Sequence, residues 1–152
     1  MPVVHGCAAD QSPVSDFSRR DARPDPRRAL GRRGEDLAAE HLARLGFAAL
    51  ARNVRTRHGE IDLIVLDGET IVFVEVKTRR VSARSAGGEN SVEPLEALRP
   101  RQRARLRRLA LAWLSDADTS RPRARTLRFD AVGVLLDDRG RLLRLEHLEA
   151  AW

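Results

Sequence analysis

The chain has 152 residues, 42% of them hydrophobic, and its net charge of +6 favours an anionic partner such as a nucleic acid. This length suits one domain with a substantial core, and the single cysteine excludes an internal disulfide and argues against a cysteine-ligated zinc site. No apolar stretch approaches the roughly 18 residues of a membrane span and the N-terminus lacks a secretory pattern, so we expect a cytoplasmic protein with no membrane partner.

Residues 1–26 contain four prolines among aspartate, serine and arginine residues and little apolar material. They therefore predict a disordered tail before a single domain over residues 27–152. Apolar residues recur at spacings of three and four from Arg27 to Leu45, which predicts an amphipathic helix ended by Gly46.

The rest of the chain predicts strands, one loop and a second helix. Strands are expected over Phe47–Val54, Glu60–Leu66 and Thr70–Lys77, with a turn at Asp67-Gly68 between the last two. The later elements, in order, are a flexible loop over 79–91, a short turn over 94–98, a helix over 100–114, a strand over 126–136, a turn over 137–140 and a strand over 141–148. We expect an α/β fold in which a mixed sheet, with an antiparallel hairpin at its centre, is flanked by helices.

Lys77 is the only lysine among the 28 Lys and Arg residues of the chain. Arginine carries a permanent charge on a planar fork, whereas lysine is a compact ammonium whose pKa can move. A position that needs the second kind of group cannot accept the first. Lys77 follows Glu75 by two residues within an apolar run, so the two side chains are expected on the same face of a strand.

The predicted hairpin gathers acidic residues. With Asp67-Gly68 as a two-residue turn, Asp62 lies opposite Phe73 and one step diagonally from Glu75, at a Cα separation of about 7–8 Å. Period-two alternation puts four polar residues on one face: Glu60, Asp62, Glu75 and Lys77. The other face would hold the apolar residues Ile61, Leu63, Val65, Val72, Val74 and Val76. A three-residue turn would separate the acids, because it flips one strand.

This group of acids predicts a divalent cation. Mg²⁺, or Mn²⁺ in its place, prefers oxygen ligands, commonly one or two carboxylates with water and phosphate. Such an ion polarises a phosphate and makes a bound water acidic, and Lys77 would orient or deprotonate that water. Glu60 is either an additional acid of the site or an ordinary surface acid. The alternative for the whole group is a cross-strand salt-bridge patch on a solvated face.

Arginines crowd the second predicted helix and the loop before it. They are Arg79, Arg80, Arg84, Arg101, Arg103, Arg105, Arg107 and Arg108. Arg79, Arg80, Arg101 and Arg105 are the candidates for contacts with backbone phosphates, and the alternative is a merely solvated helix face. Aromatic residues make up only 4% of the chain, so recognition through shape and backbone is favoured over base stacking.

Several segments resemble a known family. Asp62, twelve intervening residues and then Glu75-Val76-Lys77 resemble the active-site pattern of the restriction-endonuclease-like nucleases, the PD-(D/E)xK group. More narrowly, residues 31–35, 53–64 and 73–79 look like the YraN family, small bacterial proteins described as predicted endonucleases related to archaeal Holliday junction resolvases. Further matches are Gln102, residues 128–130 and the closing residues 147–152, so that the resemblance covers about residues 28–152.

The resemblance implies roles for individual residues. Asp62 and Glu75 would bind the metal together with the carbonyl of Val76, and Lys77 would be catalytic. Glu35, from the first helix, would join the catalytic set, and Gln102 would join the nucleic-acid contacts. One departure is that Ile61 stands before Asp62, where the larger group has the proline that gives it its name.

The hypothesis is thus a restriction-endonuclease-like protein that acts as a Mg²⁺-dependent endonuclease on DNA, including branched or structured DNA. Its rivals are a non-catalytic nucleic-acid-binding module with the same fold and, less favoured, a scaffold whose arginines meet acidic proteins. His58 could reach a substrate, whereas His41 and His147 are expected to be structural. The choice between DNA and RNA and the formation of a homodimer stay open.

Overall fold

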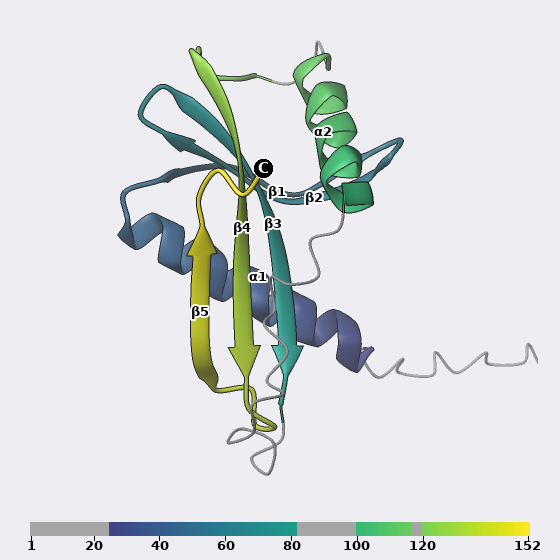
Figure 1. Ribbon diagram of the computed structural model, residues 1–152, viewed down its shortest axis with the longest axis vertical. Helices are drawn as coiled ribbons and strands as arrows, with labels where there is room; N and C mark the ends of the chain where they lie inside the picture. The colour runs from purple at the N-terminus through teal and green to yellow at the C-terminus, as the bar shows by residue number, and fades with distance from the viewer. Residues whose placement is uncertain (1–24, 82–99, 117–119) are drawn as a thin grey trace, which may run out of the picture.

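The computed structural model describes residues 25–81, 100–116 and 120–152. Its elements are α1 (Pro26–Arg44), β1 (Ala48–Thr56), β2 (Gly59–Asp67), β3 (Thr70–Arg80), α2 (Pro100–Leu114), β4 (Thr126–Leu136) and β5 (Leu142–Leu148). The strands form one five-stranded sheet in chain order (Figure 1). Only β3 and β4 pair in parallel, and the other neighbours are antiparallel. The predicted α/β fold with a mixed sheet is confirmed.

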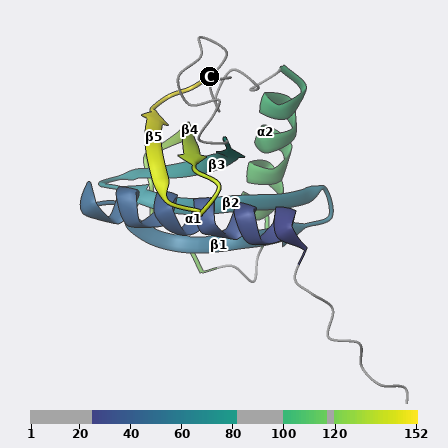
Figure 2. The same cartoon turned by 90° about the horizontal axis from the view of Figure 1, so that it is seen from below.

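The sheet is buried on both faces. On one face, α1 packs on β2, β3 and β4 through a cluster that includes Leu42, Val74 and Val134. On the other face, α2 packs through a second cluster that includes Phe73 and Trp113. Figure 2 shows that α1 runs along β1 and β2, whereas α2 stands across them. Burial on both faces is the reason that β3 begins with a continuous apolar run.

The predicted boundaries agree closely with these elements. The second helix and the fourth strand match residue for residue, and α1 begins at Pro26, where the side chain of Asp25 accepts a hydrogen bond from the backbone N–H of Arg27 at 3.0 Å. A Pro at the start of a helix loses no hydrogen bond, so the position suits it. The predicted tail over residues 1–26 otherwise lies outside the described residues, so it stays a prediction.

One boundary was wrong. Arg79 and Arg80 were expected in a loop, but they continue β3, where they pair with Leu135 and Leu136 of β4. Pairing with a neighbouring strand outweighs the loop-like composition that follows. The remainder of the expected loop and the turn over 94–98 lie outside the described ranges.

The predicted turn of the β2–β3 hairpin was placed one residue too early, so the predicted pairing was wrong by two residues. The turn is Gly68-Glu69 and not Asp67-Gly68, because Asp67 pairs with Thr70. Gly68 has φ +58°, and glycine with positive φ at the first turn position is typical of a II′ turn. Phe73 therefore lies opposite Ile64 instead of Asp62.

This correction does not separate the acids. The pairing between the two strands changes by two residues, and an even change keeps every side chain on its predicted face of the sheet. The last backbone pair of the ladder is Leu63 with Val74. Asp62 is the next residue of β2 and Glu75 the next residue of β3, so the two acids follow directly beside each other at the point where the ladder ends.

Ile61 lies on a different face from the predicted one. It was expected beside Leu63 but packs, at 0% exposure, in the α2 cluster with Ile64. Pairing of β1 with β2 continues to Thr56 and Gly59, well beyond the end of the β2–β3 ladder. The free end of the β1–β2 hairpin can therefore twist out of the plane of the sheet, and it passes beneath α2 (Figure 1).

No helix within the described residues is both long enough and apolar enough to cross a bilayer.

Candidate active site

A cavity of about 550 Å³ lies where β2 separates from β3. We call it the site cavity. The first three turns of α1, the start of β2, the second half of β3 and one arginine of α2 line it. The predicted site residues on its lining are Glu35, Asp62, Glu75, Val76, Lys77 and Arg105. Glu60 and Arg27 line it as well, so four carboxylates meet three basic side chains there.

Asp62 is held by the backbone of β3. Its Oδ2 accepts a hydrogen bond from the N–H of Val76 at 2.7 Å. The backbone pairing of β2 with β3 ends at Leu63 and Val74, and this side-chain contact continues the link between the two strands beyond that point. Burial raises the pKa of Asp62 most, and the carboxylate of Glu75 raises it further, to about 7. The structure therefore holds an acid that is costly to ionise unless a positive charge arrives.

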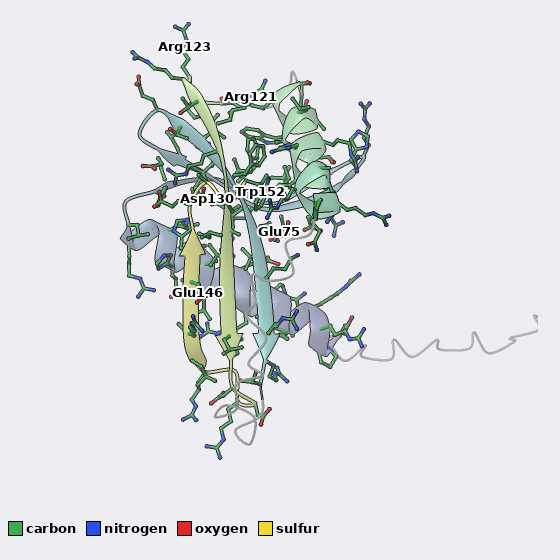
Figure 3. All side chains as sticks on the ribbon, in the orientation of Figure 1. Glu75, Arg121, Arg123, Asp130, Glu146 and Trp152 are labelled. Atoms are coloured by element: carbon green, nitrogen blue, oxygen red, sulfur yellow. The ribbon has the colours of Figure 1, made fainter. Side chains whose placement is uncertain are left out.

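Glu75 and Lys77 form an ion pair on the same face of β3. The side chain of Glu75 is only 10% exposed and that of Lys77 is 26% exposed, so the pair lies at the wall of the cavity rather than in bulk solvent. Figure 3 places Glu75 beside β3, just below α2. The only lysine of the chain thus reaches the cavity that holds the acids, as its position after Glu75 predicted.

Glu35 comes to the cavity from α1, and a residue of β1 holds it there. The side-chain amide of Asn53 donates to Glu35 Oε2 at 2.6 Å. Asn53 has φ +49°, a left-handed conformation that asparagine tolerates better than most residues. Sequence reasoning missed this positioning role, although an asparagine inside a strand is uncommon and could have signalled it. Next to it, Arg52 Nη2 contacts Asp36 Oδ1 at 2.5 Å.

A glycine lets α1 approach the sheet closely enough for this arrangement. A Cβ atom on Gly34 would lie 1.8 Å from Oγ1 and 2.8 Å from Cβ of Thr78, which stands one residue after Lys77 on β3. Only a residue without a side chain fits there. The neighbour of Gly34, Glu35, is thereby brought to the wall of the cavity.

The donors fit a hard divalent cation held by few protein ligands. Within the described ranges, no three His, Cys, Asp or Glu side chains form a ready-made metal cage. Mg²⁺ does not need one, because it usually takes one or two carboxylates and keeps several waters. Asp62 and Glu75 repel each other strongly enough to raise the pKa of Asp62, and a cation between them would remove that repulsion. The residues present therefore fit Mg²⁺ or Mn²⁺.

The predicted nucleic-acid contacts are dispersed. Of the five residues named for this role, only Arg105 lines the site cavity. Arg79 and Arg80 are exposed just beyond its edge, Arg101 is exposed at the start of α2, and Gln102 is partly buried and engaged in a contact of its own. Their contacts with a nucleic acid stay predictions.

The arginines of α2 also divide between two flanks of the helix. At 100° per residue, Arg105 and Arg108 point to one flank, with Arg101 near them, whereas Arg103 and Arg107 point to the other. Arg103 lies over the ring of Trp152, with its Cζ atom 5.8 Å from the ring centre. Only the first flank faces the site cavity.

A second polar cluster lies away from this cavity and is structural. Asp130 is fully buried and accepts hydrogen bonds from Arg128 Nε at 2.9 Å, His147 Nε2 at 2.9 Å and the backbone N–H of Ala150 at 3.0 Å. Burial alone would raise the pKa of Asp130, but these hydrogen bonds outweigh it and hold the pKa below its usual range. Because Asp130 is on β4, the cluster anchors the C-terminal segment to the sheet (Figure 3).

The predicted roles of the histidines can be compared with their surroundings. His41 and His147 pack edge to face with ring centres 5.5 Å apart, which agrees with structural roles. Burial lowers the pKa of His41 most, and His147 and Arg44 lower it further. His58 lies outside the site cavity and lines a different one.

A mixed sheet covered by one helix on each face, with acids where two central strands part, defines an α/β protein of the restriction-endonuclease-like kind. Within this class, the chain belongs to the family described as "Uncharacterised protein family UPF0102", whose profile matches residues 34–134. This confirms the resemblance to the YraN family.

Relatives of similar length share much of the sequence. A UPF0102 protein of Acidothermus cellulolyticus is 47% identical over 116 residues, which cover 72% of this chain and 83% of the relative. One of Frankia casuarinae is 46% identical over 125 residues, 82% of this chain and 96% of the relative. One of Streptomyces griseus is 49% identical over 114 residues, 75% of this chain and 88% of the relative. The similarity therefore spans the folded domain and not a single motif.

Proposed function

We propose that this protein is a metal-dependent endonuclease that hydrolyses phosphodiester bonds in DNA, with branched or structured DNA as its substrate. The observation that carries the proposal is the meeting of Asp62, Glu75 and Lys77 in one cavity, with the pKa of Asp62 raised by burial and by its neighbour. Groups whose pKa is shifted by burial and by a specific charged neighbour in a cleft are typical of catalytic sites.

Each residue has a part in the proposed mechanism. Asp62 and Glu75, with the carbonyl of Val76, would hold the cation, which would supply Lewis acidity toward a phosphate oxygen. The ion pair with Glu75 holds the side chain of Lys77 at the cavity, where it is suited to orient the attacking water and to offset the negative charge that grows on the phosphate. Arg105, which reaches the cavity from α2, would bind the phosphate.

Glu35 has a supporting part. Its carboxylate is held by Asn53, so its position in the cavity does not depend on the cation. It lies near enough to raise the pKa of Asp62 slightly. A third carboxylate at this place is suited to orient water near the cation, since carboxylates accept strong hydrogen bonds.

The test is cleavage of labelled DNA by the purified protein. Four-way junction, flap and linear substrates would be incubated with Mg²⁺, with Mn²⁺ or with EDTA. We expect cleavage of at least one structured substrate with a divalent ion and none in EDTA. Lys77→Ala and Lys77→Arg should both lower the rate by at least about 100-fold, since an arginine retains the charge but not the compact ammonium.

The control is Asp138→Asn, which changes an exposed acid in the turn after β4 and should leave the rate unchanged. Circular dichroism would show that every variant is folded. If the folded wild type cuts none of the substrates with either ion, or if Lys77→Ala cuts as fast as wild type, the proposal is wrong.

One observation favours a second candidate, a non-catalytic nucleic-acid-binding module. The contacts of Asp62 with Val76 and of Glu75 with Lys77 already give both acids a partner without any cation. Thermal unfolding with added Mn²⁺ separates the candidates. A ligand at 100 times its dissociation constant stabilises the fold by about 2.7 kcal/mol, and a nuclease should lose this increment in Asp62→Asn. A plain binding module should show no increment in either protein.

A further inference from the structure

A second cavity, of about 660 Å³, lies between the turn that joins β1 to β2 and the C-terminal half of α2. We call it the hairpin cavity. The residues of its lining that matter here are Arg55, Arg57, Arg108, Leu111 and Trp113. Its volume is within the range of cavities that bind small ligands, and it shares no lining residue with the site cavity among the described residues.

The rim of the hairpin cavity is positively charged. Arg55, Arg57 and Arg108 are all exposed. In the part of the chain that the structure describes, neither Arg55 nor Arg108 forms an ion pair, and Arg57 donates through Nε to His58 Nε2 at 3.0 Å. The one acid among the described lining residues is Asp116. Guanidinium groups held together without matching carboxylates are suited to bind a phosphate, because their fork geometry matches its oxygens.

The wall of the hairpin cavity is apolar. Leu111 is 63% exposed, whereas Trp113, only 5% exposed, belongs to the core behind it. An exposed apolar side chain next to arginines that have no carboxylate partner offers two kinds of contact at once. A nucleotide presents the same combination, with a charged phosphate on one side and a flat apolar base on the other.

Arg105 connects the two cavities. It lines the site cavity, and a Cβ atom on Gly59, in the β1–β2 turn, would lie 2.7 Å from Arg105 Nη2. Arg108 follows one turn later on the same flank of α2, about 5 Å farther along the axis. Arg105 and Arg108 therefore lie between the candidate metal site and the hairpin cavity. The distance between these two arginines along the helix axis is comparable to one or two nucleotide steps along a strand.

We propose that the hairpin cavity binds an unpaired nucleotide adjacent to the phosphodiester that is cut. Arg55 and Arg108 hold its phosphate, and Leu111 supports its base. This inference rests on the proposed nuclease function and narrows its substrate class. A base inside a continuous duplex is paired and stacked, so it cannot enter the cavity. The preferred substrate is therefore a nucleic acid with unpaired nucleotides at the cleavage position.

The test measures binding without cleavage. The full-length protein in EDTA would be titrated into two fluorescent DNA probes, a fully paired duplex and the same duplex with a single-stranded flap. Arg108→Ala should weaken binding to the flap probe about 10-fold, since contacts to an unpaired base and its phosphate contribute about 1–3 kcal/mol. Leu111→Ser should weaken it about 5-fold. Both should change binding to the duplex less than 2-fold.

Matched controls come from the same protein. Arg107→Ala removes an exposed arginine from the opposite flank of α2, and Leu143→Ser removes a leucine of β5 that is 50% exposed. Both controls should change binding to either probe less than 2-fold. Arg108→Ala should also lower the slope of log affinity against log salt concentration by about one.

Two results would overturn the inference. One is equal weakening of the flap and duplex probes, which would make Arg108 a general phosphate contact. The other is flap binding that neither variant changes. Because the assay contains no metal, its outcome is independent of catalysis. A flap-selective loss in a protein that cuts nothing would support nucleotide binding in the hairpin cavity but defeat the nuclease proposal. Cleavage of DNA by a protein whose flap binding neither variant changes would support the nuclease proposal and defeat the inference.

Discussion

The close approach of α1 to β3 at Gly34 allows a quantitative test of the packing that positions Glu35. In Gly34→Ala, the new methyl group would lie 1.8 Å from Oγ1, 2.9 Å from Cγ2 and 2.8 Å from Cβ of Thr78. Rotation about χ1 of Thr78 can move the first two atoms. It cannot move Cβ, which is bonded to the backbone of the strand, so the helix itself has to move away.

The magnitude follows from two opposing effects. Alanine is favoured over glycine within a helix by about 1 kcal/mol. Overpacking against the strand costs about 1–3 kcal/mol. Gly31 supplies the matched control, because it lies one turn earlier on the same helix and a Cβ atom there meets nothing nearer than Glu35 Oε1 at 3.9 Å. Gly31→Ala should therefore gain the helix propensity alone.

The assay is urea unfolding, followed by the fluorescence of the two tryptophans. We expect Gly34→Ala to be less stable than Gly31→Ala by about 1–3 kcal/mol, which corresponds to a difference in melting temperature of very roughly 3–12 °C for a domain of this size. The double variant Gly34→Ala with Thr78→Gly removes every atom in the overlap, so the two changes should be coupled favourably. Equal stability of the two alanine variants would refute the packing argument.

Three further predictions concern single side chains. Asp62→Asn should flatten the pH dependence of the free energy of unfolding in EDTA. The pKa of Asp62 rises to about 7 in the folded state, so the wild-type protein loses stability as the pH rises from about 4 to 7. In urea unfolding, the wild type should lose about 2–3 kcal/mol relative to the variant between pH 5 and pH 8. Asp130→Asn should lower the free energy of unfolding by about 3 kcal/mol at pH 7, since Arg128 loses a buried partner. The folded-state pKa of Asp130 is lowered, so its contribution to stability is present above its unfolded pKa and is lost in acid. The difference in stability between wild type and variant should therefore shrink in unfolding experiments below about pH 4. Asn53→Ala should destabilise the fold more than Asn53→Gly, because alanine adopts φ +49° at a cost of about 1–2 kcal/mol. Both variants should lower cleavage equally, because both lose the contact to Glu35. Equal melting temperatures of the two variants would contradict the role of the left-handed conformation.

The predicted site depended on the alternation of side chains between the two faces of a strand, which an even error in the pairing of the strands does not change. The turn was placed one residue too early, and Asp62 was set opposite Phe73. The true pairing brings Asp62 beside Glu75 instead of diagonally across from it. Both arrangements keep the acids on one face, since the side-chain period is two residues and the pairing moved by two. The position of Lys77 after Glu75 needed no register at all.

Contacts between distant elements could not be predicted in this way. Asn53 holds Glu35 only because β1 carries a left-handed residue at the level of α1, and Ile61 joins the α2 cluster only because one ladder ends before the other. Neither fact has a local signal of sufficient strength. In the same way, the basic composition of α2 indicated phosphate contacts without showing that Arg105 is the one of the five predicted contacts that lines the site cavity.

Local spacing along the chain was enough to establish the elements, the acidic face of the hairpin and the lysine that belongs to it, because alternation and helical period are properties of neighbouring residues. The walls of both cavities depended on three-dimensional packing. The site cavity forms where β2 separates from β3, and the hairpin cavity forms where the β1–β2 hairpin meets α2. Where a ladder stops, and how close a helix can approach, result from the balance of all contacts in the domain, and no short segment encodes that balance.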